Sequence, residues 1–124
     1  MPDGRFRKAL RRLTADDDDL AAEELAGRAE QHGACHIADA PSRTPVCLHG
    51  VVQSVTIRPR GGVPALEAEL YDGTATVYVT WLGRRRIEGV KPGVSLIAEG
   101  RLADADHGRR TMYNPAYRLL PAKD

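Results

Sequence analysis

The stretch LEAELYDGTATVYVTWLGRRR, residues 66–86, decides the fold. Its first half alternates apolar and polar residues, Asp72-Gly73 is a turn signal, and the alternation then resumes. A period of two places successive side chains on opposite faces of a β-strand. The stretch therefore predicts a β-hairpin with one apolar and one polar face.

The alternation also sets which side chains of the hairpin face the core. Val77, Val79 and Trp81 share one face of the second strand, whereas Tyr78 and Thr80 share the other. We predict that the first three are buried and that Tyr78 and Thr80 are at least partly exposed. A register slip of one residue would reverse every one of these assignments.

Alternation continues on both sides of the hairpin, and the chain from Val46 onward is typical of a mainly β domain. A glycine, Gly50, predicts a bend in the first strand, and Pro115 predicts an interruption or end in the last. The predicted strands are 46–60, 65–71, 74–82, 94–103 and 110–120, with a connector at 83–93. Five strands in this order predict a barrel, for which an SH3-like barrel is the structural alternative.

The N-terminal third has helical character. Residues 3–13 have apolar residues at helical spacing, and residues 16–33 begin with four aspartates that favour a helix N-terminus. We expect the second helix to pack on the barrel and to fill one open end with Leu20 and Leu25. The alternative is an acidic arm that occupies a basic groove. The predicted division is a helical extension and linker at 1–40 and a barrel domain at 41–124.

Composition restricts the class of protein. A chain of 124 residues with 42% hydrophobic residues fits one globular domain. No apolar run reaches the roughly 18 residues of a membrane span, and no secretory signal is recognisable, so we expect a cytoplasmic protein. The net charge is only +1, but an acidic segment at 16–31 offsets a basic body at 41–124.

Four segments together resemble the OB fold of nucleic-acid-binding proteins. They are VCLHGVVQSV (46–55), ELYDGTATVYVTWL (69–82), PGVSLIAEGRL (92–102) and MYNPAYRLL (112–120). The pattern is similar to the wedge domain of RecG-type helicases, to the anticodon-binding domains of some aminoacyl-tRNA synthetases, and to small actinobacterial OB-fold proteins. Ala75 departs from it, because the family often has a second glycine there. No G-x-x-x-x-G-K-[ST] loop is present in the sequence, so ATPase activity is not implied.

The resemblance implies binding of single-stranded DNA or RNA, with weak sequence preference, across the hairpin and its flanking loops. Such a surface needs cations for the phosphates and aromatic rings for the bases. Glu67 and Glu69 share this face and would repel phosphate unless arginines pair with them. The predicted binding residues are Arg58, Arg60, Tyr71, Tyr78, Thr80, Arg84, Arg85, Arg86, Arg109, Arg110 and Tyr113.

Other chemistry has weaker support in the sequence. His32, Cys35, His36, Cys47 and His49 lie close together in the chain, but their spacing matches no common zinc finger. We expect both cysteines to be free thiols and predict no metal, no cofactor and no enzymatic activity. A protein-interaction adaptor that uses the barrel and the N-terminal helix is the alternative function.

Overall fold

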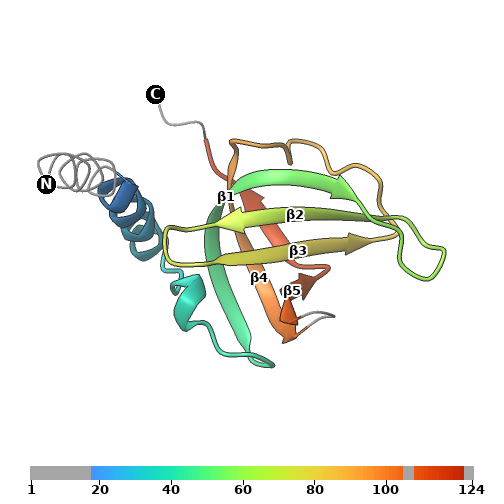
Figure 1. Ribbon diagram of the computed structural model, residues 1–124, viewed down its shortest axis with the longest axis horizontal. Helices are drawn as coiled ribbons and strands as arrows, with labels where there is room; N and C mark the ends of the chain where they lie inside the picture. Colours follow the sequence, from blue (N-terminus) through green and yellow to red (C-terminus); the bar gives the residue numbers. More distant parts are fainter. Residues whose placement is uncertain (1–17, 105–107, 122–124) are drawn as a thin grey trace, which may run out of the picture.

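The protein folds as a helix followed by a β-barrel (Figure 1). The computed structural model describes residues 18–104 and 108–121, so the predicted helix at 3–13 lies outside the described residues. Residues 18–31 are helical, which confirms the described part of the second predicted helix. A short 3-10 helix, η1 (Ile37–Asp39), precedes the strands β1 (Pro45–Ile57), β2 (Ala65–Tyr71), β3 (Thr76–Leu82), β4 (Ser95–Asp104), β5 (Arg110–Tyr113) and β6 (Ala116–Leu119).

The strands close into a five-stranded barrel of the predicted fold class. Their order is β1-β2-β3-β5-β4, and β1 also pairs with β4. The pairing of β3 with β5 is parallel, and the other pairings are antiparallel. After a break at Asn114-Pro115, β6 pairs with β4. The interruption that Pro115 predicts in the last strand is therefore confirmed.

β1 serves both halves of the barrel because it bends. Its first half pairs with β4 up to Val51, and its second half pairs with β2 from Val51 onward. A Cβ at Gly50 would lie 3.0 Å from the Cβ of Leu70, so glycine permits the close approach of β2. The register irregularity itself falls between Val52 and Ser54, a little beyond the predicted bend.

The predicted register of the hairpin is confirmed, with one exception. Val77, Val79 and Trp81 are buried, and Tyr78 is partly exposed. Thr80 was expected at the surface but is only 1% exposed. Its cross-strand neighbours are Glu67 on β2 and Tyr113 on β5. Thr80 is buried because larger side chains flank it on both sides.

The N-terminal helix docks differently from the prediction. Leu20 is 58% exposed and Leu25 is only partly buried, so these leucines do not fill an end of the barrel. Instead, Ile37 of η1 and Ala40 join the barrel core. The helix lies beside the β2–β3 turn, where the backbone of Ala22 contacts Gly73 (Figure 1).

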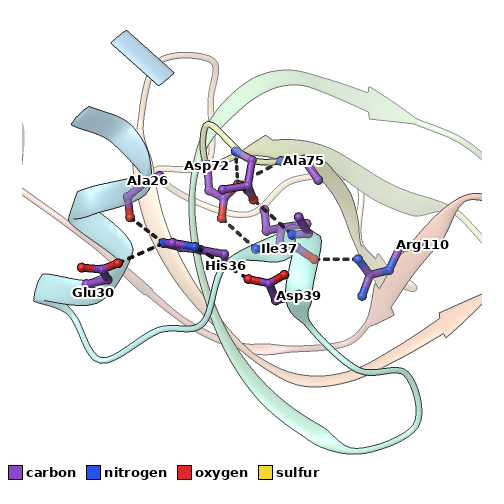
Figure 2. A network of polar contacts seen from close by, with 10 residues as sticks. Ala26, Glu30, His36, Ile37, Asp39, Asp72, Ala75 and Arg110 are labelled. Carbon is purple, nitrogen blue, oxygen red and sulfur yellow. Dashed lines mark hydrogen bonds and ion pairs between the residues drawn. The ribbon is translucent and has the colours of Figure 1, made fainter. Parts of the chain in front are cut away.

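A buried carboxylate ties the N-terminal segment to the hairpin (Figure 2). Asp72 is fully buried, and its Oδ2 accepts a 2.8 Å hydrogen bond from the backbone N–H of Ile37. Its Oδ1 accepts hydrogen bonds from the backbone N–H and hydroxyl of Thr74 and from the N–H of Ala75. Because Asp72 binds its own turn and η1 together, it sets how the N-terminal segment meets the barrel.

Arg110 completes this connection from the other side. Its Nη1 donates a 2.6 Å hydrogen bond to the carbonyl of Ile37 (Figure 2). Its Nη2 donates to the carbonyl of Ala40. We call Asp72, Ile37 and Arg110 the latch.

Among the described residues, no helix is long and apolar enough to cross a membrane.

Candidate nucleic-acid interface

The outer face of β2, β3 and β5 carries most of the predicted binding residues. The strand register places polar side chains side by side in rows across these strands. The rows are Glu67–Thr80–Tyr113, Glu69–Tyr78–Thr111 and Tyr71–Thr76. The face is therefore continuous across three strands, as an extended ligand requires.

Three arginines converge on Glu67, which is only 5% exposed. Its Oε1 accepts a 3.0 Å hydrogen bond from Nη2 of Arg109. Arg58 lies 3.8 Å and Arg60 lies 3.9 Å from the same carboxylate. We call Arg58, Arg60 and Arg109 the arginine cluster. One carboxylate facing three guanidinium groups leaves the site with a net positive charge.

Two tyrosines lie against these arginines. The guanidinium carbon of Arg109 is 3.7 Å from the ring centroid of Tyr78, and that of Arg60 is 5.9 Å from the centroid of Tyr113. Burial lowers the pKa of Arg109, but Tyr78 and Glu67 raise it above its ordinary value, so the group remains cationic. Tyr78 is thus part of an arginine–tyrosine stack rather than a bare platform. Such a stack suits both a phosphate and a base.

The structure does not bring Arg110 together with the arginine cluster, because its guanidinium group binds backbone carbonyls of the N-terminal segment. Arg109 reaches Glu67 on the outer face, whereas Arg110 binds the carbonyl of Ile37 in the latch. Met112 is buried in the core, and strand alternation places Arg110 on the same side as Met112. The two adjacent arginines therefore make contacts on opposite sides of the strand.

The remaining predicted residues lie at the edges of the face. Tyr71 is at the turn end of β2, where its hydroxyl donates to the carbonyl of Gly73 at 3.4 Å. Arg84, Arg85 and Arg86 are exposed just after β3. The preceding Gly83 donates a 2.7 Å hydrogen bond to the Pro64 carbonyl, which places this exit beside the β1–β2 loop.

The sequence predicted that Glu67 and Glu69 would repel phosphate unless arginines paired with them, and the structure shows such pairing at Glu67. The other glutamate of the face, Glu69, accepts a hydrogen bond from Ser54 instead. What the sequence did not show is that arginines from the β1–β2 loop and from the loop before β5 meet at the one carboxylate of Glu67.

Asn114 was also missed as a positioning residue. Its side chain accepts a 2.9 Å hydrogen bond from the N–H of Leu82, and its own N–H donates to the carbonyl of Thr80 at 2.7 Å. Its positive φ of 47° is one that asparagine tolerates better than most residues. Through these two hydrogen bonds, Asn114 holds the break between β5 and β6 beside the end of β3.

The histidines and cysteines near residue 40 are not gathered around one point. The rings of His32 and His49 stack with centroids 5.5 Å apart, and His36 contacts Glu30 at 3.5 Å. Cys35 and Cys47 are free thiols, and burial, with Glu99 and Cys35, raises the pKa of Cys47. Among the described residues, no group of three or more His, Cys, Asp or Glu side chains is arranged to hold a metal ion.

Comparisons with known proteins identify the fold. No protein-family model matches the chain, and no curated protein matches it in sequence. Solved structures do match, and the three described below do so at less than 20% identity, so the likeness concerns the fold.

Three of these structures illustrate the likeness. Yeast Stn1 and Ten1 match with a TM-score of 0.51 and 15% identity over 64% of this chain and 44% of that chain. RecG bound to a three-way DNA junction matches with a TM-score of 0.53 and 18% identity over 71% and 12%. A replication protein A heterotrimer bound to single-stranded DNA matches with a TM-score of 0.50 and 17% identity over 69% and 65%. The match spans less than two thirds of each neighbour, and the shared unit is an OB fold.

Proposed function

We propose that the protein binds single-stranded nucleic acid, DNA or RNA, on the outer face of β2, β3 and β5. Binding has weak sequence preference, and the protein catalyses no reaction. The observation that carries the proposal is the convergence of Arg58, Arg60 and Arg109 on one buried carboxylate beside two tyrosines.

The physical argument begins with charge. Guanidinium groups match phosphate oxygens in geometry and remain cationic at every physiological pH. In the free protein, Glu67 holds the three groups close together. A phosphate that arrives at the surface meets cations that are already gathered, so less side-chain entropy is lost on binding.

Base contacts come from the stacked residues. Arg109 covers Tyr78, and Arg60 approaches Tyr113. Planar guanidinium and phenol groups both stack on nucleobases, and every base offers a π-face. Such contacts discriminate little between bases, which agrees with weak sequence preference.

Two structural neighbours support the proposal. The RecG structure contains a three-way DNA junction, and the replication protein A structure contains single-stranded DNA. Both proteins carry an OB fold similar to this one. The likeness makes nucleic acid a suitable ligand for this fold, while the arginine cluster supplies the residues that would bind it.

A salt titration tests the proposal. Fluorescence anisotropy should detect binding of single-stranded DNA or RNA oligonucleotides in preference to duplex DNA, with affinity falling as salt rises. Replacing Arg58, Arg60 and Arg109 together with glutamine should lower the salt slope by about 2, at roughly 0.7 for each phosphate contact.

The chain offers a control with the same change in charge. Replacing Arg84, Arg85 and Arg86 with glutamine also removes three positive charges, but from the exposed exit of β3. This variant should lose much less affinity. Equal losses would show a nonspecific cationic surface instead of a built site.

A protein-interaction adaptor is the second candidate function. Ile57, Val63 and Leu82 are exposed by 53%, 45% and 41%. Apolar side chains at the surface suit a polypeptide better than a phosphate backbone. If the unmodified protein binds no oligonucleotide at low salt, nucleic-acid binding is excluded and the adaptor becomes the preferred function.

A further inference from the structure

A second site lies outside the candidate interface. A cleft of about 700 Å³ opens on the outer side of β1 and β4, beside the C-terminal end of the helix at 18–31. The helix contributes Arg28 and His32, and β1 contributes His49 and Val51. Val94, before β4, and Leu120, after β6, add apolar surface. We call this hollow the β1–β4 cleft, and its volume is in the usual range for small-molecule sites.

His49 is the unusual residue of the cleft. It lies on β1 with Leu48 directed to the core, so alternation directs His49 outward. His49 is nevertheless only 1% exposed, and His32 stacks on its ring. Its Nδ1 is buried and makes no hydrogen bond with any described residue. A buried polar atom without a partner is costly, so its presence points to a ligand that completes it.

The charge around His49 indicates which ligand. Burial, followed by the nearby His32 and Arg28, lowers the pKa of His49, whereas Asp72 raises it. The imidazole is therefore neutral at neutral pH in the free protein. Among the described residues, no carboxylate forms an ion pair with Arg28. The cleft thus combines an uncompensated cation with a neutral imidazole that an anion would help to protonate.

We propose that the β1–β4 cleft binds a small organic anion, whose phosphate or carboxylate group lies between Arg28 and His49. A guanidinium group pairs with either oxyanion through parallel hydrogen bonds. The apolar part of the ligand packs against Val51, Val94 and Leu120. Binding brings a proton to His49, so that both of its ring nitrogens, Nδ1 and Nε2, carry hydrogen. The resulting imidazolium faces the anion.

This site is separate from the proposed interface with nucleic acid. The cleft lies on β1 and β4, whereas the arginine cluster lies over β2, β3 and β5. Either site can exist without the other. A residue-resolved measurement is needed because both sites are cationic and both attract phosphate.

Two-dimensional NMR supplies that measurement. The full chain, labelled with ¹⁵N, is titrated separately with phenyl phosphate, benzoate, inorganic phosphate and uncharged benzyl alcohol. We expect saturable shifts at Val51 and Val94 with phenyl phosphate or benzoate, weaker ones with inorganic phosphate, and none with benzyl alcohol. The stronger of the two aromatic anions identifies the preferred oxyanion. Shifts confined to Tyr78 and Arg109, or absent altogether, would overturn the proposal.

Variants test the role of charge. Arg28→Gln should weaken binding of the preferred anion about tenfold, because a charged hydrogen bond is lost. Arg101→Gln removes an exposed arginine of β4 that does not line the cleft, and it should bind as the unmodified protein does. Equal affinity of the two variants would contradict the proposed site.

Proton uptake gives an independent check. Benzoate keeps its charge between pH 6 and pH 8, so its affinity should rise as the pH falls only if the protein takes up a proton. The imidazole ¹⁵N resonances of His49 should shift toward the protonated form when benzoate saturates the protein at pH 7. Because the exposed ring of His32 stacks on His49, the resonances of His49 itself decide the outcome. A His49 that stays neutral in the complex would refute the proposed contact.

Discussion

Two buried carboxylates of one hairpin differ in what surrounds them. Glu67 near the start of β2 and Asp72 just after its end are 5% and 0% exposed. Asp72 is bound by backbone N–H groups and one hydroxyl, all from the turn or from η1. Glu67 is bound by arginine side chains from loops.

This difference separates a carboxylate held by the backbone from one held by long side chains. Backbone donors are held by the fold and have no alternative partner, so the bonds of Asp72 maintain the fold. Arginine side chains can rotate away and bind phosphate instead. Burial alone therefore does not assign a role to a carboxylate, and the kind of partner, backbone or side chain, must be considered as well.

The largest expected effect follows from removing the carboxylate of Asp72. Asp72→Ala leaves the N–H of Ile37 without its partner in a buried position and loosens the turn. The free energy of unfolding should fall by about 3 kcal/mol. Urea denaturation, followed by the fluorescence of buried Trp81, measures this. Asp39→Ala removes an exposed carboxylate of η1 and should cost well under half as much; equal costs would contradict the latch.

The contact between the hairpin turn and the helix should have the next largest effect. A Cβ at Gly73 would collide with the backbone of Ala22, and its φ of +94° already favours glycine. Gly73→Ala should therefore cost about 2 to 3 kcal/mol of stability. Gly61 also has a positive φ but has no atom near the added Cβ, so Gly61→Ala isolates the backbone strain at about 1 kcal/mol. Thermal unfolding of both variants compares the two costs; similar values would mean that the helix does not rest on the turn.

Adjacent arginines should separate stability from binding. Arg110→Ala removes two hydrogen bonds to backbone carbonyls of the N-terminal segment and should lower stability by about 2 kcal/mol. It should leave oligonucleotide affinity nearly unchanged in the folded protein. Arg109→Ala should do the reverse, with a clear loss of affinity and a smaller loss of stability. Denaturation and anisotropy measurements on both variants decide, and matching effects would show that the two side chains share one task.

The smallest expected effect is a gain of affinity. Glu67→Gln keeps the shape of the side chain but removes the negative charge that a bound phosphate would face. Affinity for single-stranded DNA should rise roughly fivefold, or about 1 kcal/mol. Glu69→Gln removes the same charge from the same face without touching an arginine and should have a smaller effect. Weaker binding by Glu67→Gln would show that the gathering of the three arginines by Glu67 outweighs its repulsion of phosphate.

Local pattern was enough to predict most of the barrel. The alternation in 66–86 predicts the buried row Val77, Val79 and Trp81, because side chains on a strand must alternate between faces. Pro115 predicts the interruption of the last strand, because proline lacks the N–H that the ladder needs. The same alternation around Met112 would also have directed Arg110 inward, although its charge suggested the surface.

Features that depend on residues far apart in the chain were decided by the tertiary structure. Thr80 is buried because β5 runs parallel beside β3 and brings Tyr113 next to it. Ile37, rather than Leu20 or Leu25, enters the core because the latch holds η1 against the hairpin. A sequence shows each side chain and its nearest neighbours. Which loops meet over Glu67 is determined only when the barrel closes, because closure sets the distances between side chains from separate strands.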